Sequence, residues 1–185
     1  MNPEPALGRL LVASPTLLDP NFQRTVVLLL AHGDEGTLGV VLNRPAEVPL
    51  ADVLPTWAAL ATAPTSIFVG GPVAPGSALC LASLRPGADR DGWTAVRGPA
   101  GILDLDLGPE SVADRITRLR VFSGYAGWGP AQLAGEISSG AWFVVEGEPG
   151  DPFAPEPGRL WGAVLRRQRF DLAILATCPL DPSLN

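Results

Sequence analysis

The chain has few side chains that could do chemistry, and only one of them is a histidine. His32 follows the apolar run 26–31 and precedes the turn sequence GDEG. A Ser-His-Asp hydrolase would need it as the base, but the nucleophile signature G-x-S-x-G is absent, and SGYAG at 123–127 does not match it. We therefore predict no catalytic residue. We expect His32 to bond a neighbouring backbone group or carboxylate at a strand end.

Metal and cofactor sites also lack the residues that they need. A structural zinc site needs four ligands. The chain offers one histidine and two cysteines far apart in sequence, Cys80 and Cys178, so carboxylates would have to complete the site. Asp104 and Asp106 alternate with apolar residues, which predicts two carboxylates on the solvent face of a strand. A P-loop requires a lysine, which the chain lacks, and GYAGWG at 124–129 reverses the glycine order of the dinucleotide fingerprint. No metal and no cofactor is predicted.

The stretch after GYAGWG offers polar groups for binding. A helix that starts near Gly129 and Pro130 either presents backbone N–H groups to an anion or simply begins with a tight turn. Gln132 and Glu136 are four residues apart and share one flank of that helix, beside the apolar Leu133. They are interpreted either as the polar edge of a groove or as solvated side chains.

Charge argues against a nucleic-acid partner. The 185-residue chain has a formal net charge of −6 and a pI of about 4.7, and all thirteen basic residues are arginine. Proteins that bind nucleic acids usually carry a basic stripe, and none is visible here. The one dense run, Arg166, Arg167 and Arg169, is interpreted as a solvated helix end, where the helix dipole favours cations. We expect no direct contact with nucleic acid.

Membrane association and secretion are not predicted either. No apolar stretch approaches the length of a bilayer span, and residues 1–7 lack the basic start and apolar core of a signal peptide. Two widely separated cysteines are not a disulfide framework. We expect a cytoplasmic protein with both thiols reduced; its oligomeric state is not predicted.

The elements that must position these groups are short strands and short helices. Gly and Pro, with 21 and 20 residues, are spread along the chain, which favours many elements joined by turns. The continuous run 26–31 predicts a strand buried on both faces, paired through a turn at 33–37 with a strand at 38–43. Further strands are predicted at 10–13, 66–69, 78–84, 93–97, 102–107, 141–146 and 172–176, and helices at 50–61 (weakened by Pro55), 109–118, 130–138 and 160–168. We expect a single α+β domain, residues 1–185, with a mixed, largely antiparallel sheet surrounded by helices.

Two long motifs and a central Gly-Gly-Pro resemble the YqgE/AlgH family of small bacterial proteins, over residues 8 to 175. The first motif is Pro-x-Leu-x-Asp-Pro-x-Phe-x-Arg, followed by a strand-end His and by a Gly-containing strand that ends in Asn-x-Pro. Its residues in this chain are Pro15, Leu17, Asp19, Pro20, Phe22, Arg24, His32, Gly39, Asn43 and Pro45. The Gly-Gly-Pro is Gly70, Gly71 and Pro72. The second motif, Gly-Tyr-x-x-Trp-x-x-x-Gln-Leu-x-x-Glu, is matched by Gly124, Tyr125, Trp128, Gln132, Leu133 and Glu136, followed by Trp142 and Trp161.

The resemblance implies a single mixed α/β domain and carries no established catalytic mechanism. Leu30 stands where many members have a cysteine, and Leu79-Cys80 stands where many have Leu-His. These departures argue against a redox or metal role at either position. One member gave the family a transcriptional-regulator label, but this chain has neither a helix-turn-helix signature nor a basic face.

The predicted function is therefore binding. We expect a non-enzymatic cytosolic protein that binds a small ligand or a protein partner, with an indirect regulatory role. The alternatives are an enzyme of unknown reaction that uses the family's polar residues, and a direct transcriptional regulator. The predicted ligand-binding residues are Arg24, His32, Asn43, Gly70, Gly71, Tyr125, Trp128, Gln132 and Glu136.

The predicted site is a groove on which three turns converge, at 43–45, 70–72 and 124–129. Glycines would let the backbone come close, Tyr125 and Trp128 would form an aromatic wall, and Arg24 would bind an anionic or carbonyl group. The competing interpretation is that Arg24 and Asn43 only satisfy buried carbonyls and amides of the turns.

Overall fold

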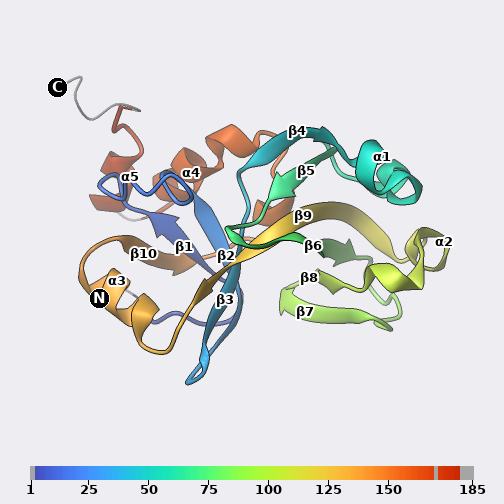
Figure 1. The fold of residues 1–185 in the computed structure, drawn as a ribbon, viewed down its shortest axis with the longest axis horizontal. Coiled ribbons are helices and arrows are strands. Elements are labelled where there is room, and N and C mark those ends of the chain that lie inside the picture. The colour runs from blue at the N-terminus through green and yellow to red at the C-terminus, as the bar shows by residue number, and fades with distance from the viewer. Residues whose placement is uncertain (1–2, 169–170, 180–185) are drawn as a thin grey trace.

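A computed structural model describes residues 3–168 and 171–179, and these residues contain ten strands in one curled sheet (Figure 1). The strands are β1 (Arg9–Ala13), β2 (Val26–Gly33), β3 (Gly36–Val41), β4 (Pro45–Pro49), β5 (Ser66–Val69), β6 (Val73–Leu84), β7 (Trp93–Arg97), β8 (Ala100–Leu103), β9 (Ile116–Trp128) and β10 (Trp142–Glu146). The helices are α1 (Leu50–Val53), α2 (Pro109–Val112), α3 (Gln132–Ser138), α4 (Pro157–Arg166) and α5 (Asp171–Leu175), with 3₁₀ turns η1 (Pro55–Leu60), η2 (Leu105–Leu107) and η3 (Asp151–Phe153).

The sheet is antiparallel along its main path and is organised around β9. The strand order is β10–β1–β2–β3–β9–β6–β8–β7, while β4 pairs with β5, and β5 runs parallel to β9. The first half of β9 pairs with β6 and its end pairs with β3, so this one strand joins the two halves of the molecule (Figure 1). The predicted mixed, largely antiparallel sheet within one domain is confirmed.

The central hairpin follows directly from its sequence. Side chains of β2 enter two cores in alternation, because Val26 and Leu28 pack in the core that contains α4, whereas Val27 and Leu29 pack in the core beneath α3. A strand buried on both faces needs the continuous apolar run that the sequence supplies. The hairpin closes between Gly33 and Gly36, so the predicted pairing of 26–31 with 38–42 is confirmed.

Helices cover the sheet only in part. In the core of the other half, Leu50 of α1, Trp57 of η1 and Val112 of α2 pack against β6, β8 and β9. The opposite surface of β6 and β8 remains open at Leu79 and Ile102, which border a large hollow. The prediction of a sheet surrounded by helices is therefore not confirmed.

The last predicted strand, 172–176, is wrong, since this segment contains helix α5. Leu172, Leu175 and Ala176 pack against the core that contains α4, and their spacing of three and four residues is that of a helix face. An apolar run of five residues is compatible with either structure, and tertiary packing decides between them.

Two further predictions in the region 102–118 are wrong. Strand β8 ends at Leu103, because Asp104 caps η2 by accepting the N–H of Asp106 at 2.9 Å, so the two carboxylates do not alternate along a strand. The helix predicted at 109–118 is only the single turn α2, and the chain is already extended at Ile116. Short polar side chains that bond nearby backbone commonly stop a regular element in this way.

Two arginines anchor loops to the core. Arg120 of β9 is buried and donates to the carbonyl oxygens of Pro152, Ala154 and Ala63 at 2.8–3.2 Å, and burial lowers the pKa of its guanidinium to about 10. Arg167 follows α4 and binds both oxygens of the buried Asp151 at 2.7 and 2.5 Å. Arg166 and Arg167 are exposed at the end of α4, as interpreted, but Arg167 is also engaged by Asp151; Arg169 lies outside the described residues.

Candidate functional site

Most of the segment 124–129, predicted as a turn, belongs to strand β9, which ends at Trp128. The strand runs from Ile116 to Trp128 without interruption. Gly124 has a φ of 70°, a conformation in which an L side chain is strained, so the strand bends at this residue. The glycines redirect a strand, and the prediction of a turn is wrong.

The Gly70–Pro72 segment lies directly against this bend. A Cβ atom on Gly124 would be only 2.6 Å from the carbonyl oxygen of Gly71, and one on Gly70 would collide with the carbonyl oxygen of Gly124. The N–H of Gly70 donates to the carbonyl oxygen of Ser123 at 2.8 Å. Gly70 and Gly71 therefore allow two backbones to touch, as the sequence predicted for this region.

Asn43 clamps two connections together. Its Oδ1 accepts the N–H of Val26 at 2.9 Å, and its Nδ2 donates to the carbonyl oxygen of Arg24 at 2.9 Å. The next residue, Arg44, accepts the N–H of Val69 at 2.7 Å, which places the 43–45 turn beside the Gly70 segment. The three segments predicted to converge are thus neighbours in space. Asn43 itself is 9% exposed and satisfies backbone groups, as the competing interpretation held.

Arg24 is half-buried at the start of β2 and has a φ of 55°. Its guanidinium donates to the carbonyl oxygens of Cys178, at 2.9 Å, and Pro179, and lies 4.5 Å from the centroid of the Trp161 ring. These contacts join the connection after β1 to α4 and to the segment that follows α5. Only one of the two terminal guanidinium nitrogens is engaged in them.

His32 lies on the exposed hairpin between β2 and β3. Its Nδ1 is 2.7 Å from the hydroxyl oxygen of Thr37, the residue opposite it in the hairpin. The strand-end hydrogen bond was predicted, although its partner is a hydroxyl instead of a backbone group or carboxylate. The described contacts place no carboxylate on the imidazole that could orient it as a base.

Trp128, Gln132 and Glu136 form one hydrogen-bonded network with Trp142. One carboxylate oxygen of Glu136 accepts the indole N–H of Trp128 at 3.0 Å and that of Trp142 at 2.8 Å; the other accepts the Gln132 amide at 3.0 Å. Gln132 in turn accepts the N–H of Gly129 at 3.0 Å. The backbone donor considered for an anion is therefore satisfied by a side chain. A ligand contact by these residues stays a prediction.

Aromatic packing completes this network. Phe22 lies 5.9 Å from Trp128 and 5.5 Å from Trp142, measured between ring centroids, and the two tryptophans are 5.9 Å apart in an edge-to-face arrangement. Trp128 is 5% exposed. Its ring contributes mainly to the core beneath α3, and Tyr125 is the aromatic residue of β9 that remains half-exposed.

The predicted site residues lie along separate hollows. Arg24 and Asn43 line a hollow of about 360 Å³ beside α4. Tyr125 and Trp128 line another of about 430 Å³ with the β2–β3 hairpin, and Tyr125 also lines the main hollow of about 720 Å³. Arg24 and Tyr125 therefore face different hollows, although their backbones belong to neighbouring segments.

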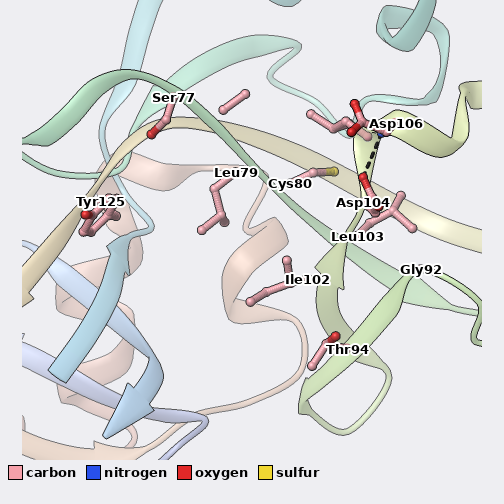
Figure 2. Close-up of a pocket in the computed structure, with 12 residues that line it drawn as sticks. Ser77, Leu79, Cys80, Gly92, Thr94, Ile102, Leu103, Asp104, Asp106 and Tyr125 are labelled. Atoms are coloured by element: carbon pink, nitrogen blue, oxygen red, sulfur yellow. Dashed lines mark hydrogen bonds between the residues drawn. The ribbon is translucent and has the colours of Figure 1, made fainter. Parts of the chain in front are cut away.

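The main hollow lies over β6 and β8, as Figure 2 shows. Leu79 and Ile102 lie across its middle, Tyr125 and Ser77 border one end, and Thr94, Asp104 and Asp106 border the other. Its volume is within the usual range for a small-molecule site, and the mixture of apolar floor and a few polar groups is typical of one.

Most of these lining residues were not predicted as site residues. Ser77, Leu79, Thr94 and Ile102 come from three different strands, and each looks like an ordinary strand residue in the sequence. The one available signal is the Pro- and Gly-containing stretch 73–77, which extends β6 beyond the predicted 78–84 and is exposed. The hollow forms only because strands that are distant in sequence pair in the sheet.

The described residues contain no group of three or more His, Cys, Asp or Glu side chains arranged to hold a metal ion. Cys80 borders the main hollow, but it is buried, and burial raises the pKa of its thiol. A protonated thiol is a weak nucleophile. Both cysteines are unpaired, as predicted. In the same residues no helix is long and apolar enough to cross a bilayer.

Comparison with known proteins agrees with the motifs that form this region. The model of the AlgH-like family matches residues 10–173. The chain belongs to this family. Among AlgH-like relatives, a UPF0301 protein of Streptomyces coelicolor is 57% identical over 182 residues, which are 96% of this chain and 94% of the relative. A UPF0301 protein of Mycobacterium tuberculosis is 48% identical over 181 residues, 96% and 90% of the two chains.

Two solved structures share the fold. The crystal structure of protein DIP2367 from Corynebacterium diphtheriae matches with a TM-score of 0.91 at 34% identity, covering 96% of this chain and 94% of that one. The solution structure of the AlgH protein from Pseudomonas aeruginosa matches with a TM-score of 0.69 at 27% identity, covering 98% and 99%. The fold of this chain is therefore shared with these two proteins.

Proposed function

We propose that this AlgH-like protein binds a small molecule in the main hollow, between Tyr125 and Thr94. Tyr125 is the observation that carries the proposal. It is the single tyrosine of the chain, it lines the hollow, and its hydroxyl forms no hydrogen bond with another described residue. The glycine contacts at residues 70, 71 and 124 hold its backbone in place. A hydroxyl on a closely packed backbone segment, beside an apolar floor, supports ligand recognition.

The lining indicates the chemical class of ligand. Leu79 and Ile102 offer an apolar surface, while Asp104 and Asp106 are the charged groups at the rim. The net charge of −6 also favours approach of a cation over an anion. We therefore infer a neutral or cationic molecule with an apolar body, whose polar end bonds the Tyr125 hydroxyl or the carboxylates.

Binding without chemistry is the simplest use of this hollow, because His32 lies outside its lining and burial raises the pKa of the Cys80 thiol. An indirect regulatory role, in which bound and free forms differ in a protein contact, belongs to the same proposal. The proposal also includes a cytoplasmic location, which is consistent with two unpaired cysteines.

A thermal-shift screen of neutral and cationic metabolites tests the proposal. A specific ligand raises the unfolding midpoint in proportion to ln(1 + [L]/Kd). We expect Thr94→Trp to fill the hollow and abolish the shift, while Ala95→Trp, one residue along β7 and outside the lining, retains it. Tyr125→Phe removes one hydrogen bond and should weaken binding about tenfold.

Equal binding by the wild type and Thr94→Trp would contradict the site. A screen in which no member of these classes shifts the midpoint would contradict the function.

A further inference from the structure

A second hollow, of about 360 Å³, has two arginines as its charged lining. Its residues, which define the arginine hollow, are Gln23, Arg24, Asn43, Arg44, Gly158 and Trp161. None of them lines the main hollow, and none is a carboxylate. We propose that the arginine hollow binds the oxyanion group, phosphate or carboxylate, of a small ligand. This site is independent of the one in the main hollow.

Both arginines are held in place by their own segments. Asn43 bonds the backbone of Arg24, which fixes the connection before β2 against the end of β3. The guanidinium of Arg44 donates to the carbonyl oxygen of Gln23 at 2.7 Å and to that of Pro20 at 3.2 Å. Arg24 lies over the Trp161 ring in an uncommon positive-φ conformation. Backbone strain of this kind concentrates at functional sites.

Each guanidinium still has donors to offer. A guanidinium carries five N–H groups. The described contacts of Arg24 involve only Nη2, and those of Arg44 use one bond from each of Nη1 and Nη2. Within the part of the chain that the structure describes, these contacts engage two of the five donors of each guanidinium. Two such forks can bind one oxyanion from two directions, which is the geometry that arginine favours for phosphate and carboxylate.

The charges around the arginine hollow also favour binding of an anion. The chain has 19 acidic and 13 basic residues, yet in the described residues neither Arg24 nor Arg44 lies within ion-pair distance of a carboxylate. Two guanidiniums on one small hollow repel each other, and an anion between them removes the repulsion. Gly158 brings the first turn of α4 to the rim, where the helix dipole has the same positive sign.

The carbonyl oxygens of Cys178 and Pro179 occupy Nη2 of Arg24. They are neutral acceptors, and a charged oxygen forms a stronger bond with a guanidinium. An oxyanion therefore either uses the remaining donors or replaces these carbonyls. In both cases the ligand contacts Arg24 and Arg44 together.

Titration calorimetry of the full chain tests this site. The probes are inorganic phosphate, phenyl phosphate and acetate, and chloride is added so that all titrations have the same ionic strength. We expect saturable binding by at least one of these anions at concentrations up to the order of 10 mM. Tighter binding of the phosphates identifies a phosphate site, and tighter binding of acetate a carboxylate site. Arg44→Gln and Arg24→Gln should each raise Kd at least about tenfold.

Arg118→Gln is the matched control, because it removes one positive charge from an exposed residue of β9 outside this hollow. It should change Kd less than about twofold. Arg44 bonds only backbone carbonyls at the surface, so Arg44→Gln keeps the test valid if Arg24→Gln does not fold. Absence of saturable binding by all three anions, or an equal loss in Arg118→Gln, would overturn the proposal.

Discussion

At Glu136 a single carboxylate collects three hydrogen-bond donors, two of which are indole N–H groups. An amide side chain has one acceptor oxygen, so only a carboxylate can serve donors on both of its oxygens. Trp128 closes β9 and Trp142 opens β10, and Glu136 ties both to α3. The Trp-x-x-x-Gln-Leu-x-x-Glu motif thus docks a helix on the sheet.

We predict that Glu136→Gln lowers the free energy of unfolding by about 1–3 kcal/mol, because the new amide N–H₂ faces donors where an acceptor is needed. Urea unfolding followed by tryptophan fluorescence measures the change. Glu110→Gln, at an exposed position of α2, is the control and should stay within about 0.5 kcal/mol. Equal stability of Glu136→Gln and the wild type would show that the network is not required.

At the scale of elements, the bend of β9 at Gly124 determines where Tyr125 lies. The bend brings the strand against Gly71 and Val73, with no room for a side chain between the backbones. The backbones can pack this closely because Gly124 has no Cβ atom, which would meet the carbonyl oxygens of Gly71 and Val73.

Gly124→Ala should therefore destabilise the protein by more than about 2 kcal/mol, from strain at a φ of 70° and collision with two carbonyl oxygens. Gly76→Ala is the matched control, since its Cβ would meet no atom within 4 Å. Denaturant titration of the two variants measures the difference. A Gly124→Ala variant no weaker than the control would contradict the close approach.

Sequence patterns predicted the elements that depend on long, uniform signals. The run 26–31 is continuous and apolar, and its strand and hairpin are confirmed. The apolar run 172–176 is too short for its pattern to distinguish a strand from a helix. In the segment 109–118, the predicted helix is cut short because its last residues belong to β9, which pairs with strands distant in sequence. The close contact of 70–72 with 124 was predictable from glycines, but the main hollow was not, because strands distant in sequence form it together.

For the whole molecule, charge and thiol chemistry give two further predictions. The net charge of −6 repels DNA at long range. Of the arginine run that could oppose this repulsion, Arg167 is neutralised by Asp151. We predict no sequence-specific DNA binding at physiological salt. A gel shift at sub-micromolar protein that survives excess competitor DNA would contradict this.

The two cysteines should differ in reactivity. Cys178 is partly exposed, whereas Cys80 is buried and the pKa of its thiol is raised. An aromatic disulfide reagent should modify Cys178 quickly in the native protein and Cys80 only on unfolding. The raised pKa also means that the folded chain retains a proton which the unfolded chain releases above about pH 8.5, so alkaline pH favours unfolding. Equal reaction rates for the two thiols would contradict the buried position of Cys80.

Amide chemical-shift mapping decides whether a small molecule binds over β6 and β8. The probe is the metabolite that raises the unfolding midpoint most in the thermal-shift screen. We predict that the perturbed amides are those of the lining, at 77–80, 92–94, 102–106 and 125. Perturbations confined to the β2–β3 hairpin or to the arginine hollow, with the lining amides unchanged, would contradict it.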